Sequence, residues 1–135
     1  MASGGEPPVA HVVLVNLGTP AAPDPPAVRA FLDEFLSDSN VVDLPRWLWL
    51  PLLRGIILRR RPARVAEAYR AIWLESGSPL IRGTVAVTEA LGAELAPRGI
   101  GVDWCLRYGD RSLARWLPGF LELTHGPIAV VPLFP

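Results

Sequence analysis

The stretch HVVLVNLGTP at residues 11–20 decides the fold of this chain. Its first seven residues are rich in β-branched side chains and apolar on both faces, which is typical of a parallel strand buried between layers of helices. Gly18 and Pro20 close the run with a turn. Two further apolar runs follow at residues 102–106 and 128–133. Because the connections between the three runs are long, we expect the strands to pair in parallel.

Helical patterns fill these connections. Asp24 supplies an N-cap ahead of two prolines and an apolar stripe that runs to Leu36. The next pattern is a short helix, or two pieces joined at Pro51, and the one after it is a clearer amphipathic helix. The order of elements predicts an α/β fold with an open parallel sheet, in which the third strand is either an exposed edge or needs further strands beside it. The predicted helices after the first cover residues 46–58, 63–75, 80–95 and 112–123.

Composition and charge exclude several classes of protein. The chain has 135 residues, of which 50% are hydrophobic and 19% charged, so it is long and apolar enough to bury one core. Its 13 basic residues are all arginine and balance 13 acids. A net charge of zero argues against a general nucleic-acid binder, because neutralising phosphates needs a surplus of basic residues.

Cysteine usage and the apolar segments indicate the compartment. Cys105 is the single cysteine, which excludes an internal disulfide framework and predicts a small core residue rather than a nucleophile. Residues 1–8 lack the pattern of a secretory signal and are expected to be flexible. No run reaches the roughly 18 apolar residues of a membrane span. We therefore expect a cytoplasmic location, with peripheral contact with the inner membrane as a further expectation.

Three groups of residues are expected to meet where ligands bind open parallel sheets, outside the carboxyl ends of the strands. They are residues 16–20, 107–109 and 132–135. On the residues alone, the simpler interpretation is that Gly18 and Gly109 only permit tight turns. A nucleotide-binding module is a weak alternative, because the first loop has neither the G-x-G-x-x-G pattern nor a P-loop lysine.

A bulky apolar segment followed by three arginines is the second feature. Trp47 and Trp49 lie in this segment, and Arg59, Arg60 and Arg61 follow it. Such a segment suits a membrane surface or the mouth of an apolar pocket, since guanidinium groups pair well with the carboxylates of a hydrophobic ligand. The alternative is a solvated basic helix end that complements the helix dipole.

The histidines offer no metal centre. His11 opens the first strand and His125 lies in a turn. Neither has a Cys, a His or clustered carboxylates at metal-ligand spacing, so we expect no metal site and no cofactor within this chain.

In order and spacing, the motifs resemble those of the ferrochelatase family over nearly all of the chain after residue 9. Each motif alone is weak, but the ordered set is specific. The motifs are VNLGTP at 15–20, FLSD at 35–38, VVDLP at 41–45, RGIIL at 54–58, Arg61-Pro62, AY at 68–69 with IW at 72–73, GSPL at 77–80, LRYG at 106–109 and PLFP at 132–135.

The resemblance implies an enzyme, a lyase of haem and porphyrin biosynthesis, that inserts ferrous iron into protoporphyrin IX. It implies a Rossmann-like fold of the chelatase type, of which residues 9–135 would form about the first half of the N-terminal lobe. Residues 32–61 would form the apolar lip of the porphyrin cleft. Leu17 matches a position facing the porphyrin at which some members carry a tyrosine. The other porphyrin-binding positions that the resemblance implies are Arg61, Tyr69, Ser78, Arg107 and Tyr108.

The family's catalytic histidine and glutamate are expected beyond Pro135, since neither His11 nor His125 matches the catalytic position. The resemblance therefore implies a fragment that holds one wall of the pocket and is inactive alone. The alternative is a non-catalytic half-domain that binds a porphyrin or a membrane surface. The expected partners are a porphyrin and ferrous iron, with no nucleic acid.

Overall fold

The computed structural model describes residues 9–135, so the flexible segment predicted at residues 1–8 lies outside the described residues. The chain divides into two compact units, which we describe separately. Of the described residues, the sheet unit comprises residues 9–17, Gly83–Arg107 and Arg111–Pro135, and the helical unit comprises Gly18–Arg82 and Tyr108–Asp110.

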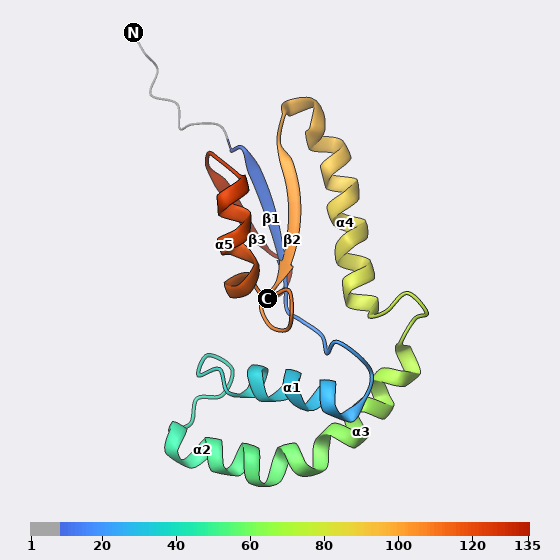
Figure 1. Cartoon of the computed structure of the whole chain (residues 1–135), viewed down its shortest axis with the longest axis vertical. Helices are drawn as coiled ribbons and strands as arrows, with labels where there is room; N and C mark the ends of the chain where they lie inside the picture. Colours follow the sequence, from blue (N-terminus) through green and yellow to red (C-terminus); the bar gives the residue numbers. More distant parts are fainter. Residues whose placement is uncertain (1–8) are drawn as a thin grey trace. The chain divides into compact units, whose positions relative to one another are not determined.

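The sheet unit is built on three parallel strands, as predicted (Figure 1). Strand β1 (His11–Asn16) lies between β2 (Gly101–Leu106) and β3 (Ile128–Pro132). Both pairings are parallel, with the start of β1 opposite the starts of its two neighbours. Among the residues that the structure describes, β3 pairs with β1 alone, and its Val130 is 52% exposed.

Helices cover the two faces of this sheet (Figure 1). On one face Val13, Val15 and Cys105 are buried against Trp116 and Phe120 of α5 (Leu113–Leu123). The other face is covered by α4 (Pro79–Leu95), which leads through the short η2 (Ala96–Arg98) into β2. Both faces of β1 are thus covered, which explains why the residues between His11 and Asn16 are all apolar.

The helical unit packs α1 (Pro25–Leu36) along α3 (Leu58–Ile72) (Figure 1). The predicted N-cap is confirmed, since the Asp24 carboxylate accepts a hydrogen bond of 2.9 Å from the Ala27 amide. Val28 and Phe31 of α1 are buried, as are Leu58 and Ala66 of α3. Fully burying a valine, leucine or phenylalanine side chain contributes about 1.5–3 kcal/mol, and a single methyl group such as that of Ala66 contributes less.

Of the two predicted alternatives, a single helix is correct at Pro51, because the helix passes through this proline, but it does not end at residue 58. α2 (Arg46–Leu52) continues into a π-helical turn, η1 (Leu53–Ile57), which continues into α3. Pro51 and Pro62 lie on either side of this turn, and each lacks the amide that would bond the carbonyl four residues before it. We attribute the wide turn to the distortion that these two prolines impose on one helix.

α3 also ends three residues earlier than predicted, at Ile72 rather than Glu75. The reason is a tight turn in which Leu74 and Gly77 exchange two backbone hydrogen bonds of 3.1 and 3.0 Å. Gly77 has φ of +109°, a conformation that favours glycine. Because α2, η1 and α3 are continuous, the three arginines Arg59–Arg61 lie in the interior of one helix rather than at a helix end.

Gly18 provides a direct test of the packing that follows the first strand. Its φ is +140°, and a Cβ at this position would come within 2.7 Å of the Tyr108 carbonyl oxygen. We expect Gly18→Ala to lower the free energy of unfolding by about 1–3 kcal/mol, measured by urea denaturation.

Gly83→Ala is the matched control, because a Cβ there meets nothing within 4 Å in the interior of α4. This change should raise the free energy of unfolding by about 0.5–1 kcal/mol. Equal effects of the two substitutions would contradict the close approach at Gly18.

Candidate functional site

The carboxyl ends of the three strands converge in the sheet unit, as predicted. The Arg107 amide donates to the carbonyls of Asn16, at 2.7 Å, and Leu17, at 3.1 Å. On the other side, the Leu133 amide donates to the Val15 carbonyl at 2.8 Å. These bonds extend the ladder beyond the strands and hold residues of all three chain segments at one edge of the sheet.

Asn16 fixes this edge to α4. Its amide Nδ2 donates to Thr84 Oγ1 at 2.9 Å, and its Oδ1 accepts from the Leu17 amide at 2.8 Å. The side chain therefore turns the chain out of β1 and ties this turn to a helix of the same unit. Sequence reasoning placed Asn16 at the strand end but did not assign it this structural role.

In the helical unit, hydrogen bonds hold both the segment after β1 and the loop after β2. Ser78 and Thr19 are both buried and joined by a hydrogen bond of 2.9 Å between their hydroxyls. Tyr108 is also buried; its ring packs edge-on against Phe35, and its hydroxyl donates to Asp38 at 2.7 Å. The Gly109 amide donates to Glu34 at 3.1 Å. The loop after β2 is thus bonded to α1 and to the segment that follows it.

The six site residues expected from the sequence divide between the two units. Leu17 and Arg107 lie in the sheet unit, adjacent through the backbone bond described above. Arg61, Tyr69, Ser78 and Tyr108 lie in the helical unit. Ser78 and Tyr108 are buried with engaged hydroxyls, whereas Arg61 and Arg107 are exposed. Their assignment to a porphyrin site stays a prediction.

Tyr69 lies about two turns beyond Arg61 on α3. Its half-buried ring packs edge-on against Trp73, with 6.1 Å between the ring centroids. Burial raises the pKa of the Tyr69 hydroxyl above its ordinary value of 10.0, so the group stays protonated at neutral pH. Tyr69 therefore presents an aromatic ring and a neutral hydroxyl.

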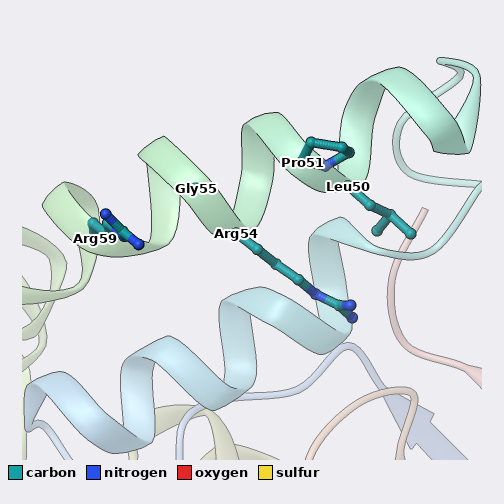
Figure 2. Close-up of a pocket in the computed structure, with 5 residues that line it drawn as sticks. All are labelled: Leu50, Pro51, Arg54, Gly55 and Arg59. Atoms are coloured by element: carbon teal, nitrogen blue, oxygen red, sulfur yellow. The ribbon is translucent and has the colours of Figure 1, made fainter.

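A hollow of about 490 Å³ opens on the helix formed by α2, η1 and α3 (Figure 2). It is wide open to solvent, so it is a shallow surface depression rather than an enclosed cavity. Arg54 reaches from η1 across to α1, where its Nε lies 3.2 Å from the Asp33 carboxylate. The hollow thus combines apolar side chains with two guanidinium groups, one of which is paired. The lining residues are Leu50, Pro51, Arg54, Gly55 and Arg59.

Sequence reasoning identified part of this hollow. The cluster Arg59–Arg61 was singled out, but the lining arginines are Arg54 and Arg59, whereas the resemblance pointed to Arg61. Residues 51, 55 and 59 recur at four-residue spacing along one row of the helix, and residues 50 and 54 form the neighbouring row; this spacing is the signal that was available. The π turn between them changes the angular relation of these residues, and that turn was not predicted.

The lip, residues 32–61, exposes large apolar side chains. Trp47 is 79% exposed, Ile56 is 54% exposed and Leu48 is 50% exposed. Trp49 differs, because its indole donates to the Leu36 carbonyl at 2.6 Å and its ring is half-buried. Of the two tryptophans, only Trp49 is therefore partly buried. Within residues 9–135, no helix is long and apolar enough to cross a membrane.

Cys105 lies fully buried in the sheet unit, as predicted for a core residue. Burial raises the pKa of its thiol, with Arg111 opposing this shift and Asp103 adding to it. The thiolate is the nucleophilic form, so the raised pKa argues against a catalytic cysteine here.

His11 is held at the amino end of the sheet. Its ring packs edge-on against Phe120, and its Nε2 lies 3.7 Å from the Asp103 carboxylate. Nε2 is buried and makes no hydrogen bond to any residue that the structure describes. The residues described also contain no group of three or more His, Cys, Asp or Glu side chains that could hold a metal ion.

Comparison with known proteins supports one family. The sequence profile of the ferrochelatase family matches residues 10–135. A coproporphyrin III ferrochelatase from Symbiobacterium thermophilum is 50% identical over 124 residues, which is 92% of this chain and 39% of that protein. Ferrochelatases from Edwardsiella ictaluri and Aromatoleum aromaticum are 49% and 46% identical, over 92% and 97% of this chain and 38% and 37% of theirs. The chain thus spans less than two fifths of the length of these relatives.

Solved structures add nothing to this comparison, since none matches the chain.

The environment of Cys105 predicts how slowly the thiol reacts. At pH 7.5 the buried, protonated thiol should react with a disulfide reagent at least about 100-fold more slowly in the folded chain than in 6 M urea. Because the pKa is raised above 9.0, reactivity in the folded chain should increase only in more alkaline solution. Since Cys105 is the single cysteine, Cys105→Ser gives the blank. Labelling at the same rate with and without urea would contradict the buried position.

Proposed function

The chain belongs to the ferrochelatase family, and from this premise we propose that it forms one wall of the porphyrin site of an enzyme that inserts ferrous iron into a porphyrin. The hollow at Arg59 is the observation that carries the proposal. It joins an apolar surface to a guanidinium group, and a porphyrin has an apolar face and carboxylate side arms.

The side chains that line the hollow complement the chemical groups of a porphyrin. Arginine binds a carboxylate through two parallel hydrogen bonds, which sets both position and orientation. Arg54 is already paired with Asp33, so we assign the propionate contact to Arg59. Gly55 leaves the floor of the hollow open, since a Cβ there would meet nothing within 4 Å. A porphyrin edge would lie over Leu50 and Gly55 with its propionate at Arg59.

We propose ferrous iron and protoporphyrin IX as the substrates of the whole enzyme, with protohaem as the product. One relative carries the name coproporphyrin III ferrochelatase, so the tetracarboxylate coproporphyrin III is the competing substrate. The two differ in the number of carboxylates, and a comparison of their affinities decides between them.

We place the metal-inserting chemistry outside this chain. His11 is enclosed by Phe120 and Asp103, which leaves its buried Nε2 unable to receive a metal ion from solvent. The single thiol, Cys105, is buried and protonated. His125 is exposed, but it belongs to no group of three or more metal-ligating side chains among the described residues. We therefore propose that the role of the 135 residues is to bind and orient the porphyrin.

A second candidate function is attachment to a membrane surface through the lip. The exposed Trp47, Leu48 and Ile56 favour it, because tryptophan and aliphatic side chains partition into the boundary between headgroups and acyl chains. Basic residues outnumber acidic ones on the same helix, which suits anionic lipids. Between residues 46 and 70 the arginines are Arg46, Arg54, Arg59, Arg60, Arg61, Arg64 and Arg70, and the one acid is Glu67.

Titration of deuteroporphyrin IX, followed by its Soret absorbance, tests the porphyrin proposal. Arg59→Ala should weaken binding by about tenfold, since a hydrogen bond to a charged group contributes about 1.5–3 kcal/mol. Gly55→Leu should weaken it as well by filling the hollow, without loss of stability. Arg64→Ala is the matched control, because Arg64 is exposed on the same helix and does not line the hollow.

Two outcomes would redirect the assignment. A loss of affinity in Arg61→Ala but not in Arg59→Ala would favour the position given by the family resemblance. If porphyrin binding is absent but the chain sediments with phosphatidylglycerol vesicles, the membrane-surface function replaces the porphyrin function.

A further inference from the structure

We propose that the ion pair between Arg54 and Asp33 selects porphyrins by the number of their carboxylates. The pair favours a dicarboxylate, such as protoporphyrin IX, over the tetracarboxylate coproporphyrin III. The inference rests on the proposed function and deepens it, because it names the substrate class that the hollow selects. It also assigns a role to Asp33, which lies on α1 and is not among the residues that line the hollow.

The charge at the hollow comes from three side chains of the helical unit. Arg54 and Arg59 line the hollow, and none of its lining residues is acidic. Asp33 neutralises one of the two guanidinium groups, since its Oδ1 lies 3.2 Å from Arg54 Nε. Arg59 forms no ion pair with any residue that the structure describes. The hollow therefore offers a ligand one uncompensated positive charge, at Arg59.

The Asp33 carboxylate is held in place beside Arg54. The Ser37 hydroxyl, one turn further along α1, donates to the same Oδ1 at 3.2 Å. The neighbouring acid, Glu34, has a different partner, because it accepts from the Gly109 amide at 3.1 Å. The negative charge that α1 presents to Arg54 is thus that of Asp33, and two donors fix the position of its oxygen.

The pairing leaves much of the Arg54 guanidinium open to a ligand. The side chain is 57% exposed, and Figure 2 shows it reaching from η1 toward α1. The bond to Asp33 uses Nε, which carries one of the five N–H donors of an arginine. A ligand carboxylate that approached the other donors would lie close to the Asp33 carboxylate, and like charges repel. Asp33 therefore disfavours a second carboxylate at this side of the hollow.

The two candidate porphyrins differ in the groups that would meet this repulsion. Coproporphyrin III has a propionate on every pyrrole ring and carries propionates where protoporphyrin IX has vinyl groups. With one propionate at Arg59, the adjoining edge of the ring lies over Leu50 and Gly55, toward Arg54. A vinyl or methyl group suits this apolar surface, and protoporphyrin IX can turn its second propionate to solvent. Coproporphyrin III brings a further carboxylate toward Asp33.

A purely structural role of the pair predicts something different. If the pair only joined α1 to η1, the loss of Asp33 would weaken the binding of both porphyrins by the same factor. A specificity role changes the ratio of the two dissociation constants. Both side chains are partly exposed, and exposed ion pairs contribute little to stability, so the variants are expected to fold.

The experiment titrates deuteroporphyrin IX, a dicarboxylate, and coproporphyrin III onto the whole chain and follows the Soret absorbance. It compares the wild type with Asp33→Asn, Asp33→Glu and Glu67→Gln. Asparagine keeps the shape of aspartate and an acceptor for Ser37 but removes the charge, whereas glutamate keeps the charge. Glu67 is exposed on α3 and does not line the hollow, so Glu67→Gln controls for the loss of one negative charge.

We expect Asp33→Asn to lower the Kd of coproporphyrin III about three- to fivefold at low ionic strength, the scale of an exposed ion pair. The Kd of deuteroporphyrin IX should change by less than about twofold. The ratio of the two constants should stay at its wild-type value in Asp33→Glu and in Glu67→Gln. In about 1 M salt, where the screening length falls to roughly 3 Å, the gain for coproporphyrin III should disappear.

An unchanged ratio in Asp33→Asn would overturn the proposal and leave the porphyrin site in place, as would an equal loss of affinity for both porphyrins. An equal change of the ratio in Glu67→Gln would also overturn it, because the effect would then reflect net charge alone. If the wild-type chain binds neither porphyrin, the proposed function fails, and the specificity element fails with it.

Discussion

The pairing of β1 on both sides is the constraint on which the rest of the structure depends. Its two parallel neighbours satisfy the hydrogen-bonding groups on both edges of the strand, and α4 and α5 cover its two faces (Figure 1), so residues 12–15 are all apolar. Its end at Asn16 then sets where the other segments stop. Arg107 and Leu133 bond to the carbonyls at the end of β1, which places the loops after all three strands at one edge. Ligand sites in open parallel sheets lie at this edge.

The strands were predictable because the apolar pattern of a buried strand lies within the strand's own sequence. Val12–Val15 carry four consecutive apolar residues, and the strand signal needs no information from the rest of the chain. The N-cap at Asp24 was predictable for the same reason, since a short acidic side chain ahead of two prolines accepts the first free amides of a helix. The open parallel sheet followed from the order of these elements.

The errors lie where distant residues decide the conformation. Proline ordinarily ends or kinks a helix, but the helix through Pro51 continues, because a π turn takes up the distortion and α1 packs along the resulting helix. The same turn brings Arg54 beside Asp33 and leaves Arg59 lining the hollow. A sequence shows three adjacent arginines but not which of them faces the site.

Arginine suits each of these places for a physical reason. Its guanidinium is planar and weakly hydrated, so it can lie against aromatic rings and still form directed hydrogen bonds. Arg111 does so between Trp104 and Trp116, and the open hollow at Arg59 presents the same chemistry to an incoming carboxylate.

The most direct test of the account is insertion of zinc into deuteroporphyrin IX by this chain, with the Edwardsiella ictaluri ferrochelatase as the positive control. The account predicts that the chain binds the porphyrin without forming the metalloporphyrin above background, and catalytic turnover by these 135 residues would contradict it.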